Sequence, residues 1–229
     1  MISLRDLGSL ILDRGYQLNQ HLRHLVSTGM IEGYADGTLD PVLLLPGVFE
    51  TWQFLRPVAD RLNAAGHPIH VLPGLGYNRK TIAASAELAQ RYLEARDLRG
   101  VILVAHSKGG LIGKHMMVTD DRESRIAQLI AINTPFGGSK WARHHPSSTL
   151  RAFSPTDETV VRLMAALDAN HRITSIYSRL DPLIPGGSRL EGATNRELDL
   201  VGHFRLLGSR QLFEAVEDSI GGVQGSEAR

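Results

Sequence analysis

The stretch that decides the fold is Val101-Ile-Leu-Val-Ala-His-Ser-Lys-Gly-Gly110. Residues 100–105 are apolar almost throughout, and such a run predicts a parallel strand that is buried on both faces. Residues 108–118 carry the spacing of a helix. Ser107 therefore lies at a sharp turn between a strand and a helix, where its hydroxyl is presented at the edge of a sheet.

The segment Ala105-His-Ser-Lys-Gly109 matches the pattern Gly-x-Ser-x-Gly with Ala in the first position. The pattern needs small residues because strand and helix approach closely there, and Gly109 and Gly110 supply that room. Gly113 lets the helix lie close to the sheet. The start of the helix also directs backbone N–H groups toward the serine. We therefore predict that Ser107 is a nucleophile, the alternative being an accidental serine in a tight turn; His106 would pack or polarise the turn.

Strands and helices alternate on both sides of this turn. The predicted strands are 42–45, 69–72, 100–105, 126–132, 172–177 and 197–201, and the predicted helices are 51–65, 81–96, 108–118, 159–167 and 206–217. This alternation predicts an α/β fold with a mostly parallel central sheet and helices on both faces. Ligands bind such sheets at the C-terminal ends of the strands. Residues 133–171 are too few for a large cap domain.

A separate helical pattern precedes the first strand. Its apolar residues share one helix face and are Leu4, Leu7, Ile11, Leu18, Leu22 and Leu25. We expect residues 1–32 to form an N-terminal helical leader that docks on the body through this face. A homodimer contact or a membrane-surface helix is the alternative. Residues 33–220 would form the catalytic domain and residues 221–229 a flexible tail.

Composition limits the function classes. A chain of 229 residues can bury one sizeable core, and its formal net charge of +1 offers no broad surface for nucleic acid. The chain has no cysteine, which excludes disulfides and thiolate metal sites. It shows neither a signal peptide nor an apolar run of about 18 residues. We therefore expect a cytoplasmic protein without a transmembrane segment.

Further motifs accompany the serine turn. They are Leu45-Pro-Gly-Val48, Asn133-Thr-Pro-Phe-Gly-Gly-Ser139 and a late Asp and His. Together, over roughly residues 41–219, they resemble the α/β-hydrolase superfamily, and within it bacterial lipases and esterases whose serine turn reads Ala-His-Ser-x-Gly-Gly. The resemblance implies an α/β-hydrolase fold and the order serine, acid, histidine.

The resemblance implies a catalytic triad of Ser107, Asp181 and His203. Asp181 follows the fifth strand, where the acid loop of the superfamily falls, although Asp-Pro is also a common turn. Asp199 is the competing acid, but it lies inside a predicted strand. His203 follows Gly202, which permits an unusual backbone there.

The resemblance also implies an oxyanion hole formed by the backbone N–H groups of Val48 and Lys108. Pro46 stands where those lipases carry a histidine, and a backbone donor at Val48 is compatible with that change. We expect Glu50 either to border the entrance of this site or to face solvent. An apolar acyl pocket is expected from residues in loops at this end of the sheet, namely Phe49, Trp52, Phe136, Leu183 and Ile184, with Trp141 and Phe153 nearby. Core packing is the alternative for each.

These residues predict a serine hydrolase that cleaves carboxylic esters, with a small-molecule substrate bearing an apolar acyl group. Ser107 would form an acyl-enzyme that water then hydrolyses. We expect no cofactor and no catalytic metal. Acyl transfer, thioester, amide or C–C hydrolysis could use the same triad. A non-catalytic ligand-binding protein with this fold is the alternative from another class.

Overall fold

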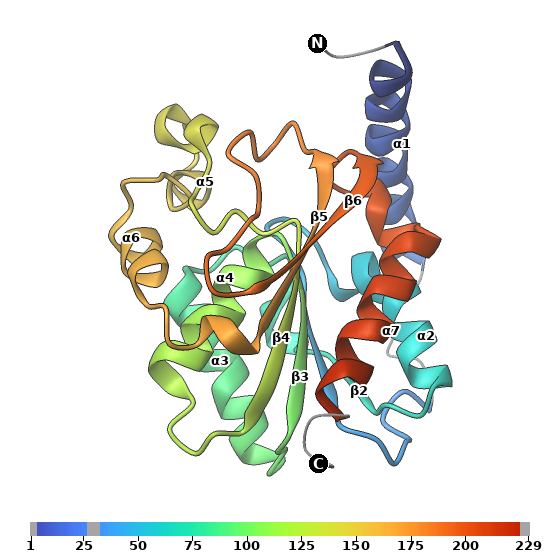
Figure 1. The fold of residues 1–229 in the computed structure, drawn as a ribbon, viewed down its shortest axis with the longest axis vertical. Coiled ribbons are helices and arrows are strands. Elements are labelled where there is room, and N and C mark those ends of the chain that lie inside the picture. The colour runs from blue at the N-terminus through green and yellow to red at the C-terminus, as the bar shows by residue number, and fades with distance from the viewer. Residues whose placement is uncertain (1–3, 27–32, 225–229) are drawn as a thin grey trace.

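A computed structural model describes residues 4–26 and 33–224. Its centre is one six-stranded sheet in the order β2-β1-β3-β4-β5-β6 (Figure 1). The strands are β1 Val42–Leu45, β2 Ile69–His70, β3 Val101–His106, β4 Ile126–Ile132, β5 Ile173–Leu180 and β6 Thr194–Val201. All neighbouring strands pair in parallel, so the predicted parallel sheet is confirmed.

Helices cover both faces of the sheet, as the alternating pattern predicts. They are α1 Leu4–Val26, α2 Arg56–Ala64, α3 Ile82–Ala95, α4 Lys108–His115, α5 Ser148–Arg151, α6 Glu158–Ala165 and α7 Arg210–Gln224. In Figure 1, α3, α4 and α6 lie on one side of the sheet, and α2 and α7 lie on the other. Each side has its own hydrophobic core. None of the helices in the described part of the chain is long and apolar enough to cross a membrane.

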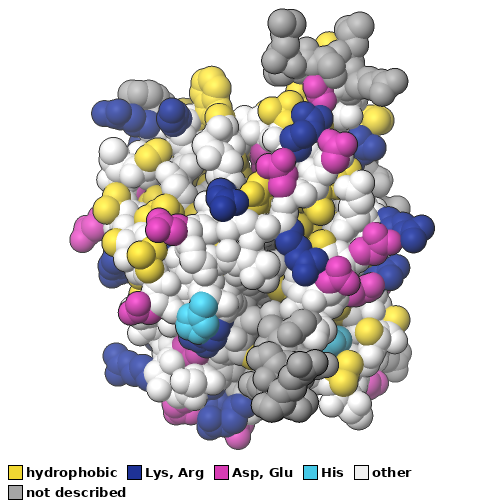
Figure 2. Space-filling view, in the orientation of Figure 1, with side chains coloured by type: hydrophobic (Ala, Val, Ile, Leu, Met, Phe, Trp, Pro, Cys, Tyr) yellow, Lys and Arg dark blue, Asp and Glu magenta, His cyan; other side chains and the backbone are white. Residues whose placement is uncertain are grey.

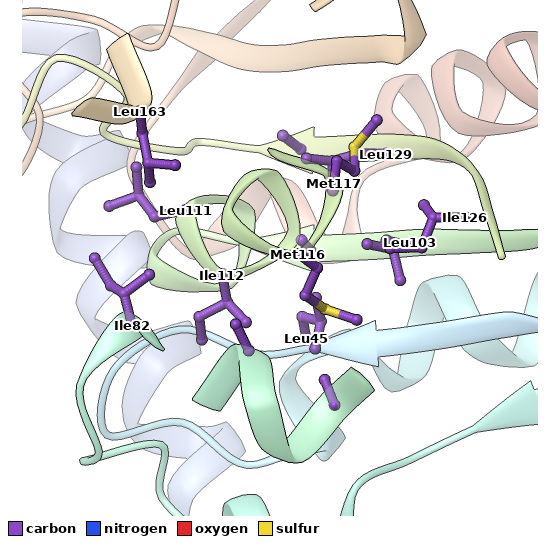
Figure 3. Close-up of a cluster of buried hydrophobic side chains, with 14 of the residues drawn as sticks. Leu45, Ile82, Leu103, Leu111, Ile112, Met116, Met117, Ile126, Leu129 and Leu163 are labelled. Carbon is purple, nitrogen blue, oxygen red and sulfur yellow. The ribbon is translucent and has the colours of Figure 1, made fainter. Parts of the chain in front are cut away.

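Helix α4 lies unusually close to the sheet because glycines face it. A Cβ atom on Gly109 would lie 1.8 Å from the carbonyl oxygen of Leu45, and one on Gly113 would lie 2.8 Å from a methyl carbon of Leu129. Leu111 and Ile112 of the same helix, with Met116 directly after its end, fill the surrounding core (Figure 3). The glycines therefore act as the sequence predicts, and they fix the place of the turn that precedes α4.

Local sequence explains where the neighbouring helices begin. The Thr81 hydroxyl accepts a hydrogen bond from the N–H of Ala84 at 3.2 Å and caps the start of α3. The helix predicted for residues 51–65, with a later start near Arg56 as the alternative because of Pro57, begins at Arg56 as α2, and a 3₁₀ turn, Trp52–Leu55, precedes it. Pro57 suits the first turn of α2, where no backbone donor is needed.

The orientation predicted for the N-terminal helix is wrong. Leu7, Ile11 and Leu18 are 52%, 68% and 62% exposed, and Figure 2 shows hydrophobic side chains among charged ones where Figure 1 places α1. The buried face is polar and consists of Asp6, Asp13 and Gln20, seven residues apart. The side chains of Leu4, Leu22 and Leu25 lie outside the described part of the structure.

Hydrogen bonds explain why the polar face of α1 docks. The Asp13 carboxylate accepts the backbone N–H groups of Phe204 and Arg205, each at 2.7 Å. Asp6 forms an ion pair with Arg179 of β5 at 3.1 Å. The same face therefore satisfies backbone donors of the body that an apolar face would leave unpaired.

The other boundaries differ slightly from the predicted ones. Helix α7 runs to Gln224, beyond the start of the tail expected at residue 221, and residues 225–229 lie outside the described part. Residues 133–172 between β4 and β5 contain only short helices, α5 and α6 among them. As expected, no large cap domain is present in the described residues.

Candidate active site

Ser107 occupies a strained turn between β3 and α4. Its φ and ψ angles are 51° and −118°, a conformation that residues other than glycine rarely adopt. Hydrogen bonds hold it there: the Ser107 N–H donates to the carbonyl of Ile132 at 2.9 Å, and the Ser107 carbonyl accepts from Gly110 at 3.1 Å. The sheet on one side and the helix on the other therefore hold the backbone of Ser107 in this strained conformation.

Asp181 and His203 meet at the same edge of the sheet. Asp181 follows β5 and His203 follows β6, and the Asp181 Oδ2 lies 2.6 Å from the His203 Nδ1. The other carboxylate oxygen accepts the backbone N–H of Leu183 at 2.9 Å. Gly202 has a φ of 121°, as the sequence led us to expect at the residue before the histidine. Asp181 thus orients the ring of His203.

The charge on His203 depends on opposing effects. Burial is the largest and lowers its pKa, but the charge and hydrogen bond of Asp181, together with the carboxylates of Glu50 and Asp13, outweigh it. The net result is a pKa above the ordinary value of 6.5. His203 is therefore a stronger base than an ordinary histidine side chain.

Ser107 and His203 line one pocket. The described residues include no hydrogen bond between the serine hydroxyl and the ring. Such bonds are often long in unliganded sites and tighten when substrate binds. The structure thus brings all three predicted triad residues to the C-terminal edge of the sheet, and its closest contact among them is the one between Asp181 and His203.

The loop after β1 borders the serine. Phe49 has a φ of 60°, and its N–H donates to the carbonyl of Tyr77 at 2.9 Å. The Gly47 N–H donates to the Glu50 carboxylate at 2.8 Å. Val48 lies between these two engaged amides and lines the pocket. No acceptor for the Val48 N–H is found among the described residues, so this group can serve a bound oxyanion.

The side chain of Lys108 supports this loop indirectly. Its Nζ donates to the carbonyl of Asn78 at 2.8 Å and also to that of Lys80. Asn78 in turn donates to the carbonyl of Pro46 at 2.7 Å. Burial lowers the pKa of Lys108 to about 8. The side chain therefore holds the loop that carries Val48, while its own backbone begins α4.

The pocket has a volume of about 270 Å³ and is lined mainly by apolar groups. Leu183 and Ile184 line it, as predicted. Its remaining lining residues are Val48, Glu50, Ser107, Pro135, Ser139, Trp141, Ala142, His145, Leu150, Phe153, His203 and Phe204. The segment between β4 and β5 thus contributes a whole wall, although of the lining residues in this wall the sequence analysis named only Trp141 and Phe153 for the pocket.

Three residues predicted for this pocket lie elsewhere. Trp52 packs edge-on against Tyr34 and lines a separate hollow. Phe136 is 1% exposed and belongs to the core between α4 and the sheet. Phe49 does not line the pocket; its ring lies under the guanidinium of Arg79, 5.5 Å from the ring centre. The sequence indicated that these aromatic residues lie near the active end of the sheet, but it did not show whether each ring points into the pocket or away from it.

Glu50 lines the pocket, which agrees with one of its two expected places, but the sequence did not predict its burial or its partner. It is 2% exposed, and its carboxylate lies 2.8 Å from the Nδ1 of His106. Ligand atoms of Glu50, His106 and His203 lie within 4.8 Å of one another, a spacing that could hold a metal ion. In the structure the carboxylate of Glu50 and the Nδ1 of His106 lie within hydrogen-bond distance of each other.

The chain adopts the α/β-hydrolase fold. No protein-family model matches it. Among solved structures it resembles the mature lipase BlEst2 of Bacillus licheniformis, with a TM-score of 0.63, 14% identity and coverage of 80% of this chain and 91% of that one. A carboxylesterase of Nitrososphaera gargensis gives a TM-score of 0.60, 14% identity and coverage of 84% and 93%. An N-formylmaleamic acid deformylase of Pseudomonas putida S16 gives a TM-score of 0.60, 18% identity and coverage of 80% of this chain and 93% of that one.

Proposed function

We propose that this protein is a serine hydrolase that cleaves carboxylic esters. The observation that carries the proposal is one pocket in which a strained serine, a histidine bonded to a buried aspartate and an apolar wall converge. The similar structures include a lipase and a carboxylesterase, which supports hydrolysis of esters. The similar deformylase shows why the substrate itself must be tested.

The proposed reaction has two halves. The Ser107 Oγ attacks the ester carbonyl carbon while its proton passes to the Nε2 of His203. The carbonyl oxygen becomes an oxyanion that accepts hydrogen bonds from the N–H groups of Val48 and Lys108. His203 then gives its proton to the departing alkoxide, and an acyl-enzyme remains. In the second half water attacks the acyl carbon and gives a proton to His203; the bond from the acyl carbon to the Ser107 Oγ then breaks, His203 returns the proton to that oxygen, and the acid is released.

Asp181 keeps the proton of the His203 ring on Nδ1, so that Nε2 is the free base that faces the serine. The acyl group would occupy the pocket beside Leu183, Ile184 and Phe153, because these side chains offer apolar contact and little hydrogen bonding. We therefore expect the substrate to carry an apolar acyl group.

A fluorophosphonate probe tests the nucleophile. It should label the wild-type protein at Ser107 and fail to label the Ser107→Ala variant. Ser139→Ala is the matched control, because this serine lines the same pocket but its hydroxyl donates to the carbonyl of Leu183 at 2.9 Å. A folded wild-type protein that never reacts with the probe would argue for a non-catalytic ligand-binding protein.

A panel of p-nitrophenyl esters of increasing acyl length, with glycerides, amides and thioesters alongside, tests the substrate class. We expect ester hydrolysis to have the highest kcat/KM, and we expect release of free acid even when alcohols are added. Dominant acyl transfer to an added alcohol, or faster amide cleavage, would replace the ester assignment while keeping the triad.

A further inference from the structure

Two buried polar residues contact the candidate active site without belonging to the proposed triad. Glu50 ends the loop that carries Val48, and His106 immediately precedes Ser107. They are 2% and 0% exposed, and the two oxygens of the carboxylate lie 2.9 and 2.8 Å from the Nδ1 of His106. A charged group buried this deeply requires partners, and each of its contacts here leads to the site.

The carboxylate of Glu50 closes its own loop. Its Oε2 accepts the N–H of Gly47 at 2.8 Å, which ties the start of the loop to its end. A Cβ atom at position 47 would lie 2.4 Å from the Oε1 of Glu50, so only glycine leaves space for the carboxylate against the backbone. The amide of Val48 lies inside the turn that this bond closes.

The other nitrogen of His106 reaches the loop of the catalytic histidine. Its Nε2 lies 3.0 Å from the backbone carbonyl of His203, which can only accept a hydrogen bond. The Nε2 therefore carries a hydrogen atom. The same carbonyl also accepts from the side-chain amide of Asn133 at 3.1 Å. The backbone of His203 is thus fixed by the residue before Ser107 and by the residue that follows β4.

We propose that Glu50 and His106 form a positioning pair, which sets the oxyanion loop and the His203 loop at fixed places relative to Ser107. The inference rests on the proposed function, because it assigns roles to groups of that site. Three segments that are far apart in the sequence meet through this pair: residues 47–50, residue 106 and residue 203. Neither side chain exchanges a proton with substrate in this role.

The pair also explains how a carboxylate can lie beside a forming oxyanion. A proton lies between the Nδ1 of His106 and Glu50, since one of the two must donate in this bond. The pair is therefore neutral as a whole, whichever atom holds the proton. An unneutralised Glu50 in the same pocket would repel the negative charge that develops on the substrate.

A glutamine at position 50 can reproduce every one of these contacts. Its carbonyl oxygen accepts the N–H of Gly47, and its amide donates to the Nδ1 of a neutral His106, which keeps its hydrogen on Nε2. Alanine can make none of them. The two substitutions therefore separate the geometry of the pair from the charge of Glu50.

The experiment measures kcat and KM on the best ester of the panel, with competent sites counted by fluorophosphonate labelling. We expect Glu50→Ala to lower kcat by about 10- to 100-fold, the range expected when a reacting group or an oxyanion donor is displaced, with KM changed less than about twofold. Glu50→Gln should recover most of this loss. His106→Phe should resemble Glu50→Ala, and the double variant should be no worse than either single one.

Val58→Ala is the control for simple destabilisation, because Val58 is a core residue of α2 outside both loops. It should leave kcat per labelled site unchanged. A Glu50→Ala protein with wild-type kcat per labelled site would overturn the proposal. A Glu50→Gln protein as impaired as Glu50→Ala would also overturn it, because the charge of Glu50 would then matter rather than its contacts.

Amide hydrogen exchange tests the pair independently of hydrolysis. Peptides that cover residues 46–50 and 201–206 should exchange faster in Glu50→Ala than in the wild type, and Glu50→Gln should remain near the wild type. A wild type that neither labels nor hydrolyses esters would refute the proposed function alone, and these exchange rates would still decide the positioning role. Equal exchange in wild type and Glu50→Ala would refute that role.

Discussion

Asp13 of α1 accepts a hydrogen bond from the backbone N–H of Phe204 at 2.7 Å, and Phe204 directly follows His203. The same oxygen accepts the N–H of Arg205, also at 2.7 Å. A residue near the start of the described chain therefore caps the short 3₁₀ helix Arg205–Gly208 that follows the candidate base. Helix α1 is consequently part of what holds the site together.

Replacing Asp13 with alanine removes the acceptor that the buried N–H of Phe204 and the partly buried N–H of Arg205 share. We expect the free energy of unfolding to fall by about 1–3 kcal/mol, as for other unpaired buried donors, and kcat to fall as the His203 loop loosens. Urea unfolding and ester hydrolysis measure the two effects. Asn19→Ala, on the exposed face of the same helix, is the control. Equal unfolding midpoints for the two variants would contradict this role of Asp13.

Replacing Gly109 with alanine forces a Cβ atom to within 1.8 Å of the backbone oxygen of Leu45. Strand and helix must then separate, and we expect a loss of at least about 1–3 kcal/mol, as in overpacked cores. Thermal unfolding measures it. Gly186→Ala is the matched control because its Cβ would meet no atom within 4 Å. A Gly109→Ala protein as stable as that control would show that α4 can move at no cost.

The pH dependence of kcat/KM should follow the neutral form of His203. Only the neutral ring can take the proton of Ser107, and the nearby carboxylates raise the pKa of His203 despite its burial. Activity should therefore be low in acid and rise with pH, with a midpoint above the ordinary value of 6.5. A midpoint below 6.5, or no pH dependence, would contradict His203 as the base.

Replacing Asp181 with asparagine should lower kcat by roughly 10⁴-fold, because the ring of His203 then favours the wrong tautomer. The competing acid, Asp199, is the control: its side chain is 85% exposed and pairs with Arg179 on the surface. Asp199→Asn should keep wild-type kcat. The reverse ranking of the two variants would assign the acid role to Asp199.

Local features of the sequence predicted the parallel sheet and the turn at Ser107, whereas the resemblance to a known superfamily implied Asp181 and His203 as its partners. The apolar strand before Ser107 and the glycines after it specify the turn over a few residues, so no distant information was needed. The strands predicted at 42–45 and 126–132 match β1 and β4 in the structure. Asp181 and His203 follow strands, and parallel strands bring such residues to one edge.

Contacts between distant segments explain what the sequence missed. Glu50 and His106 are 56 positions apart, and nothing in the local pattern of either indicates their bond. The spacing of Leu7, Ile11 and Leu18 identified one face of α1, but periodicity does not tell which face docks. The polar face docks because Phe204 and Arg205 offer donors to Asp13.

The bond between Asp13 and Phe204 joins residues 191 positions apart. Contacts of such high sequence separation are slow to form, because a long loop of chain must close before they bring any stability. The His203 loop should therefore reach its final place late in folding, after the sheet has formed. In a refolding experiment, the rate of ester hydrolysis should then recover later than the secondary structure. This delay would measure when α1 docks on the body.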